Sequence, residues 1–313
     1  MTPHFYRSVS RRGLHVLFLI GTLVYGRTWP LLLVGFLLAG CESNQAPEPR
    51  PSQPAQTTDA IEFDKATASE LAGQVVWGGA VPQVAPYRSP PNPLSEPSPQ
   101  RGLRDWPNPC APAVDPSGGV GRAVVFLRGV DPRRAKPWDL PPVRVDLAQY
   151  EIRVHQGDAV GRCGFVRRGD SVDFVSNQAV FHSLQGRGAA YFALPFPAIN
   201  VVSRRPLEHA GIVELSSGAG YYWMRAYLHV LDNPYATLTD GQGHFTLSQV
   251  PPGRYQLVVW HPNWQEAAHA RDADTCQVCR LALQPPLEVV RPINIGPSER
   301  LSVTITLRAA SAR

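Results

Sequence analysis

The side chains in this sequence that could bind a transition metal are dispersed along the chain. Two of them, His182 and Met224, offer an imidazole and a thioether, which copper accepts as ligands. A copper ion that transfers electrons in a protein needs two imidazoles and a thiolate besides a weak thioether, because that set fixes a trigonal site. His182 and Met224 alone do not supply it, so we expect no bound metal and no cofactor.

The five cysteines are the other residues capable of redox chemistry. Apart from Cys41, they form an even set that allows three disulfide pairings in an oxidising compartment: Cys110, Cys163, Cys276 and Cys279. Cys276 and Cys279 form a CxxC motif, which favours either a local disulfide or two structural thiols, because neither helical periodicity nor a second CxxC accompanies it. Arg280 stands where a haem attachment site would need a histidine.

The first forty residues indicate an export signal. Arginines precede an apolar run that ends in Leu38-Ala39-Gly40-Cys41, which resembles the lipobox of bacterial lipoproteins. We therefore predict a signal peptide over residues 1–40 and a lipid on Cys41, the first residue of the mature chain. The alternative is an uncleaved membrane anchor, for which the apolar run from Trp29 to Gly40 is short.

Removal of residues 1–40 also changes the charge of the chain. The formal net charge of +5 includes four arginines in that segment, so the mature chain carries +1. This balance does not indicate a nucleic-acid partner. We expect a bacterial cell-envelope protein attached to a membrane through its lipid. Glu42 favours the outer membrane, because it is not the aspartate that marks inner-membrane retention in enteric bacteria.

The elements that must position these residues are predicted to be β-strands. Short runs of β-branched and aromatic residues recur between Gly, Pro, Asp and Asn, without sustained helical periodicity. These runs are Ala123–Leu127, Val143–Leu147, Glu151–Val154, Ser171–Val175, Ile212–Leu215, Tyr227–Leu231, His244–Leu247, Arg254–Trp260 and Leu301–Leu307. They predict an all-β fold of two β-sandwiches. A disordered tether is predicted over residues 41–66, and a second proline-rich stretch, Pro82–Pro116, is either disordered or functional.

The stretch Ala236–Pro262 has the most specific local pattern. Asp240-Gly241-Gln242-Gly243 and Pro251-Pro252-Gly253 predict two turns with an alternating strand between them. The pattern resembles the transthyretin-like sandwich of the carboxypeptidase regulatory domain, which also occurs as a fibronectin III-like domain in rhamnogalacturonan lyases. The resemblance implies this sandwich for residues 67–138 and 232–310, and it says little about function.

The intervening residues, 139–231, resemble a cupredoxin-like Greek-key domain inserted in that sandwich or followed by it. Val166–Leu184 is similar to the cupredoxin segment that ends near the first histidine ligand, and Gly211–Tyr235 is similar to the last ligand loop. Four positions correspond to copper ligands: His182 and Met224 keep ligand residues, whereas Gly218 and Tyr221 replace the cysteine and the second histidine. The resemblance is thus to a degenerate cupredoxin without type 1 copper.

The sequence favours a non-catalytic protein that acts by binding or scaffolding through its two sandwiches. No GxSxG, HExxH, Walker or dinucleotide-binding motif occurs. Partners would be polysaccharides or other envelope proteins. A carbohydrate-binding module is one alternative, with exposed rings that stack on sugars: Tyr221, Tyr222, Trp260 and Trp264. A copper electron-transfer protein is the other, with an atypical ligand set that recruits Cys163 or His209.

Overall fold

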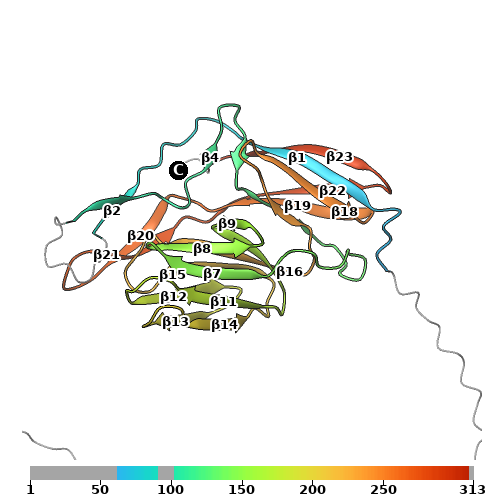
Figure 1. Ribbon diagram of the computed structural model, residues 1–313. Coiled ribbons are helices and arrows are strands. Elements are labelled where there is room, and N and C mark those ends of the chain that lie inside the picture. The colour runs from blue at the N-terminus through green and yellow to red at the C-terminus, as the bar shows by residue number, and fades with distance from the viewer. Residues whose placement is uncertain (1–61, 91–101, 310–313) are drawn as a thin grey trace, which may run out of the picture. The chain divides into compact units, whose positions relative to one another are not determined.

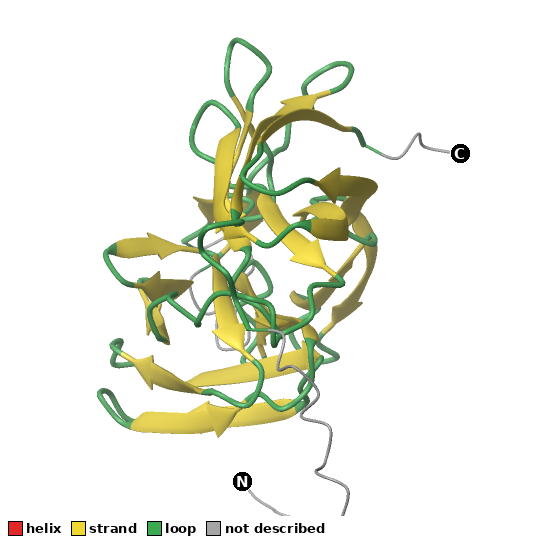
Figure 2. Cartoon of the chain, turned by 90° about the vertical axis from the view of Figure 1, so that its right-hand side faces the viewer, coloured by secondary structure: helices red, strands yellow, loops and turns green. Residues whose placement is uncertain are grey.

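The computed structural model describes residues 62–90 and 102–309, and every helix-or-strand element within them is a β-strand (Figures 1 and 2). The predicted all-β fold is therefore confirmed, and each predicted run overlaps a strand. The predicted signal peptide, Cys41 and most of the predicted tether lie outside the described residues. Among the described residues, no helix has the length and hydropathy needed to cross a membrane.

The first sandwich takes its strands from both ends of the described chain. Its outer sheet has the order β18-β1-β23, formed by His244–Val250, Ser69–Trp77 and Arg300–Leu307. Its inner sheet has the order β17-β6-β19-β22, formed by Ala236–Leu238, Val124–Arg128, Gly253–His261 and Leu287–Ile295. Strand β1 pairs in parallel with β23 and antiparallel with β18. Leu71, Leu257 and Ile305 are among the side chains buried between the two sheets.

The second sandwich uses only strands from the middle of the chain. One sheet has the order β10-β16-β15-β12-β13, formed by Cys163–Arg167, Arg225–Leu231, Gly211–Ser217, His182–Gly188 and Phe192–Phe196. The other has the order β14-β11-β7-β8-β9, formed by Val202–Pro206, Ser171–Ser176, Val143–Ala148, Glu151–Gln156 and Ala159–Gly161. Phe174, Leu184 and Leu228 lie in the core between these sheets.

A third apolar cluster joins the two sandwiches, because strands on each side of it are buried on both faces. In β6, Val125 belongs to the core of the first sandwich, whereas Phe126 belongs to the third cluster. In β16, Leu228 belongs to the core of the second sandwich and Tyr227 to the third cluster. We call this cluster the interlayer core: Cys110, Val124, Phe126, Phe165, Tyr227, Ala236, Val258 and Trp260.

Three short ladders complete the fold. They pair β2 (Tyr87–Ser89) with β3 (Arg104–Trp106), β4 (Ala113–Val114) with β5 (Val120–Gly121), and β20 (Glu266–Arg271) with β21 (Val278–Leu283). The described parts of the proline-rich stretch Pro82–Pro116 belong to this fold: Trp106 packs against the core of the second sandwich, and Cys110 is fully buried in the interlayer core.

Candidate functional site

His182, at the expected position of the first copper ligand, begins β12 and is 1% exposed. Its imidazole lies against two tyrosine rings, with its centroid 5.2 Å from that of Tyr221 and 6.3 Å from that of Tyr150. Trp106 and Trp223 stack 4.5 Å apart and extend this cluster, which we call the aromatic cluster. The surroundings of His182 are therefore mainly aromatic rings, which do not ligate copper.

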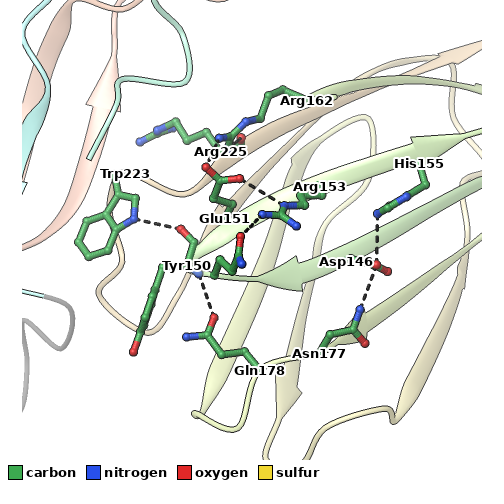
Figure 3. Close-up of polar contacts among 11 residues, drawn as sticks. Asp146, Tyr150, Glu151, Arg153, His155, Arg162, Asn177, Gln178, Trp223 and Arg225 are labelled. Carbon is green, nitrogen blue, oxygen red and sulfur yellow. Dashed lines mark hydrogen bonds and ion pairs between the residues drawn. The ribbon is translucent and has the colours of Figure 1, made fainter. Parts of the chain in front are cut away.

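Tyr150 reaches the aromatic cluster because it occupies the two-residue turn between β7 and β8. Gln149 and Tyr150 have φ values of 53° and 58°, and a type I′ turn requires positive φ at both positions. The N–H of Tyr150 donates to Oε1 of Gln178 at 2.9 Å, and its carbonyl accepts from Nε1 of Trp223 at 3.1 Å (Figure 3). These hydrogen bonds help to hold the left-handed backbone and so position the ring beside His182.

The imidazole of His182 is neutral at pH 7. Neither ring nitrogen has a hydrogen-bond partner among the described residues. Burial without a partner disfavours the imidazolium and lowers the pKa of His182 to about 4. A neutral imidazole could bind a metal, but no group of three His, Cys, Asp or Glu side chains in residues 62–90 and 102–309 is placed to hold one.

Of the other three ligand positions, only Met224 keeps a side chain that binds copper. A Cβ on Gly218 would lie 2.7 Å from Nε2 of Gln185 and 2.9 Å from Oγ of Ser183, so a larger side chain needs these two to move. Tyr221 is buried, and its hydroxyl donates to the carbonyl oxygen of Phe181 at 3.5 Å. Met224 is buried in the core of the second sandwich. A phenol and a glycine supply neither the imidazole nor the thiolate that type 1 copper needs.

The residues proposed for an atypical copper set are not brought to His182 either. Cys163 packs against the interlayer core, whereas Tyr221 beside His182 belongs to the core of the second sandwich. His209 is exposed in the connection before β15. The donor set of this fold therefore does not fit copper, and we derive no redox step from it.

The candidate sugar-stacking residues are less accessible than expected. Trp260 was expected to be exposed, but it is 1% exposed, because both faces of the last part of β19 are covered. Tyr221 is also buried, whereas Tyr222 and Trp264 are half-buried. The ring of Trp264 packs 5.7 Å from that of Trp77. The expectation of an exposed Trp260 was therefore wrong, and these rings do not form an open platform.

The described cysteines are free thiols, so of the two alternatives for Cys276 and Cys279 the structure has two thiols. Cys276 is exposed in the turn between β20 and β21, where its φ is 56°, and the thiol of Cys279 donates to the carbonyl of Ala270 at 3.5 Å. Sγ of Cys110 lies 3.5 Å from the hydroxyl of Tyr227. Burial raises the pKa of Cys163 to about 12, which keeps it a thiol at neutral pH.

A cavity of about 390 Å³ lies beside the interlayer core, and the sequence patterns did not indicate it. Strands β8, β9 and β10 of the second sandwich, β17 of the first, and residues on either side of Cys110 line it. Its volume falls within the range of about 300–1,000 Å³ that is usual for small-molecule sites. The apolar walls include Leu140, Pro141, Val154, Val160, Phe165 and Leu238.

The polar groups inside this cavity are mostly engaged by the protein itself. The side-chain amide of Gln156 donates to the carbonyls of Pro141 and Phe165, each at 2.8 Å, and its oxygen accepts from the N–H of Phe165. Nδ1–H of His261 donates to the carbonyl of Pro262 at 2.7 Å, and burial lowers the pKa of this histidine. The interior therefore presents a neutral, largely apolar surface with the thiol of Cys163 in its wall.

Comparison with known proteins gives a weak and partial likeness. No family model and no curated protein matches the chain. It is similar to a Cu(I) amicyanin with methionine replaced by alanine (18% identity, TM-score 0.23, 29% of this chain and 82% of that one). A second is an oxidised amicyanin with methionine replaced by leucine (15% identity, TM-score 0.23, 31% of this chain and 96% of that one). A third is a reduced amicyanin with tryptophan replaced by tyrosine (16% identity, TM-score 0.23, 34% of this chain and 98% of that one). Such a likeness carries no copper chemistry to this chain.

Proposed function

We propose that the protein is a non-catalytic, lipid-anchored binding protein of the bacterial cell envelope, and that it holds a small, largely apolar molecule in the cavity beside the interlayer core. The observation that carries this proposal is the cavity of about 390 Å³ at the junction of the two sandwiches. Small-molecule sites are commonly concave, mostly apolar and placed where two structural units meet.

The chemistry of the lining supports binding over catalysis. Cys163 is the one thiol in the cavity wall, and its raised pKa of about 12 makes it a poor nucleophile at neutral pH. His261 lines the cavity as well, but its Nδ1 is committed to the carbonyl of Pro262. No Asp or Glu is among the residues that line the cavity. A general acid or base paired with a nucleophile is thus missing from its walls.

Binding is tested with N-phenyl-1-naphthylamine, an uncharged apolar probe that fluoresces in apolar surroundings. The chain from Glu42 onward contains the whole compact unit, 57–313, and avoids probe binding to a lipid. We expect saturable binding. Val160→Trp should weaken it at least about tenfold, because this half-exposed valine lines the cavity and the indole ring would fill it.

The matched control is Val290→Trp, which places the same ring on an exposed valine of β22 outside the cavity. This variant should bind the probe as the unmodified chain does. Equal loss in both variants, or no loss in either, would place the probe elsewhere on the surface and remove the support for a ligand in the cavity.

The lipid anchor rests on the Leu38-Ala39-Gly40-Cys41 pattern of the sequence. We expect the full-length protein, expressed in a Gram-negative host, to enter the detergent phase in a phase-partition assay, and Cys41→Ser to move it to the aqueous phase. Cys276→Ser, which changes an exposed cysteine of the folded unit, is the control and should stay in the detergent phase. Retention of Cys41→Ser in the detergent phase would show that the apolar run before Cys41 holds the protein there without a lipid on Cys41.

A further inference from the structure

We propose that the natural ligand of the cavity is an amphipathic anion, whose apolar body fills the cavity and whose acidic head group binds Arg122 and Arg162. This inference rests on the proposed function and adds the chemical class of the ligand. Its basis is the distribution of charge around the cavity: two arginines line it, and no acidic residue does.

Arg122 is the more available of the two cations. It lies between β5 and β6 with a φ of 61°, and its N–H is held by the carbonyl of Thr239 at 3.0 Å. Its side chain is exposed, and no carboxylate among the described residues forms an ion pair with it. A guanidinium group has five N–H donors in a planar fork, which matches a carboxylate or a phosphate.

Arg162 adds a second positive charge, which the protein neutralises only in part. Its Nη2 lies 3.1 Å from Oε1 of Glu151, while the other oxygen of that carboxylate lies 3.3 Å from Nε of Arg153 (Figure 3). One carboxylate is thus shared between two guanidinium groups. Burial is the main cause that lowers the pKa of Arg162, and the charge of Glu151 opposes it. Arg122 and Arg162 both line the cavity.

Asp240 of the first sandwich is not among the residues that line the cavity. Asp240 lies close to Gly121 through its backbone, but its carboxylate accepts from the N–H groups of Gln242 and His244 in its own turn. His261 in the cavity wall is neutral at pH 7, since burial lowers its pKa. The positive rim and the apolar interior therefore fit one molecule with both properties, which neither an inorganic anion nor a neutral hydrocarbon has.

The test compares two probes that differ only by a sulfonate group: N-phenyl-1-naphthylamine and 8-anilinonaphthalene-1-sulfonate. We expect the chain from Glu42 onward to bind the sulfonate more tightly, and Arg122→Gln to weaken that binding about fivefold while leaving the uncharged probe unchanged. Arg280→Gln is the control, because it removes the same charge from an exposed residue outside the cavity. Arg280→Gln should change the affinity for neither the uncharged probe nor the sulfonate probe.

The possible outcomes separate the two proposals. If the uncharged probe binds in the cavity but the sulfonate binds no better, the anionic ligand is excluded and the binding function stands. If neither probe binds, the proposed function fails, and the inference fails with it. Equal weakening of both probes by Arg122→Gln would also overturn the role of its charge. Thermal unfolding of Arg122→Gln, compared with the unmodified chain, checks that the fold is intact.

Competition identifies the head group. Displacement of the sulfonate probe by decanoate or by decyl phosphate supports the proposal, and the stronger competitor shows whether a carboxylate or a phosphate is preferred. Displacement by inorganic phosphate at the same concentration would show that a bare anion suffices, which overturns the requirement for an apolar body. Added salt should reduce the preference for the anionic probe, because the head-group contact lies at an exposed rim.

Discussion

The free energy of unfolding should fall by about 4 kcal/mol between pH 7 and pH 5, with His182 and His229 contributing about 2 kcal/mol each. Both are 1% exposed, and burial lowers their pKa values from 6.5 to about 4 and about 3. Below pH 6.5 the unfolded chain therefore binds protons that the folded chain does not. This difference favours unfolding until the pH falls to the pKa values that the two histidines have in the folded protein. His261, with its pKa also lowered, acts in the same direction.

Urea unfolding at the two pH values measures this effect. His229→Leu should remove about half of the pH dependence, because it deletes one of the two proton-binding groups. It should also raise stability at pH 7, since neither ring nitrogen of His229 has a partner in the described part of the chain. His209→Leu, at an exposed position, is the control. A difference between pH 7 and pH 5 below about 1 kcal/mol would contradict the burial of these rings.

Trp260→Ala should destabilise the protein by about 3–5 kcal/mol, the range for removing a large aromatic side chain from a core. Trp260 fills the space between the two sandwiches, with its ring 5.0 Å from that of Tyr227 and 4.8 Å from that of His229. Trp260→Phe should restore more than half of the loss, because the indole N–H has no partner among the described residues and its removal costs nothing.

The comparison for this experiment is Trp264→Ala. This tryptophan is close to Trp260 in sequence, but its side chain is only half-buried. We expect Trp264→Ala to lower the free energy of unfolding by about 1–2 kcal/mol, because folding buries less apolar area of this side chain. Denaturant unfolding of the three variants measures the differences. An equal loss at Trp264 and Trp260 would contradict the larger contribution that we assign to the fully buried ring of Trp260.

Nine of the 23 strands in the described part of the chain could be predicted from the sequence because their own residues favour them. Val143–Ala148 alternates buried and more exposed residues, and Arg254–Trp260 is rich in β-branched and aromatic side chains. Strands β12 and β14 were missed because His182–Gly188 and Val202–Pro206 contain Gly, Arg, Ser or Pro. Tertiary pairing holds them instead: β12 lies between β13 and β15, and Arg204 of β14 forms an ion pair with Asp173 of β11.

The candidate site was predictable only in part. Local similarity to a ligand loop indicated that His182 and Tyr221 have a common neighbourhood, and their rings do lie 5.2 Å apart. The burial of Trp260 depends on a sheet from the other sandwich. The one local indication was that the last residues of Arg254–Trp260 are all apolar, as in a strand that is buried on both faces. The cavity combines residues near Cys110 with β9 and β17, which are far apart in sequence, so no local pattern could reveal it.

The parallel pairing of β1 with β23 sets an order in which the polypeptide can reach its final form. Residues 70–77 pair with 300–307 as well as with β18, so the outer sheet of the first sandwich cannot close until nearly all of the chain has been synthesised. All strands of the second sandwich are complete long before, by Leu231. We expect a slow last step dominated by this distant contact, since loop-closure entropy is lost before the pairing compensates for it. Delayed closure fits the export that we propose, because a translocon threads a chain before it folds.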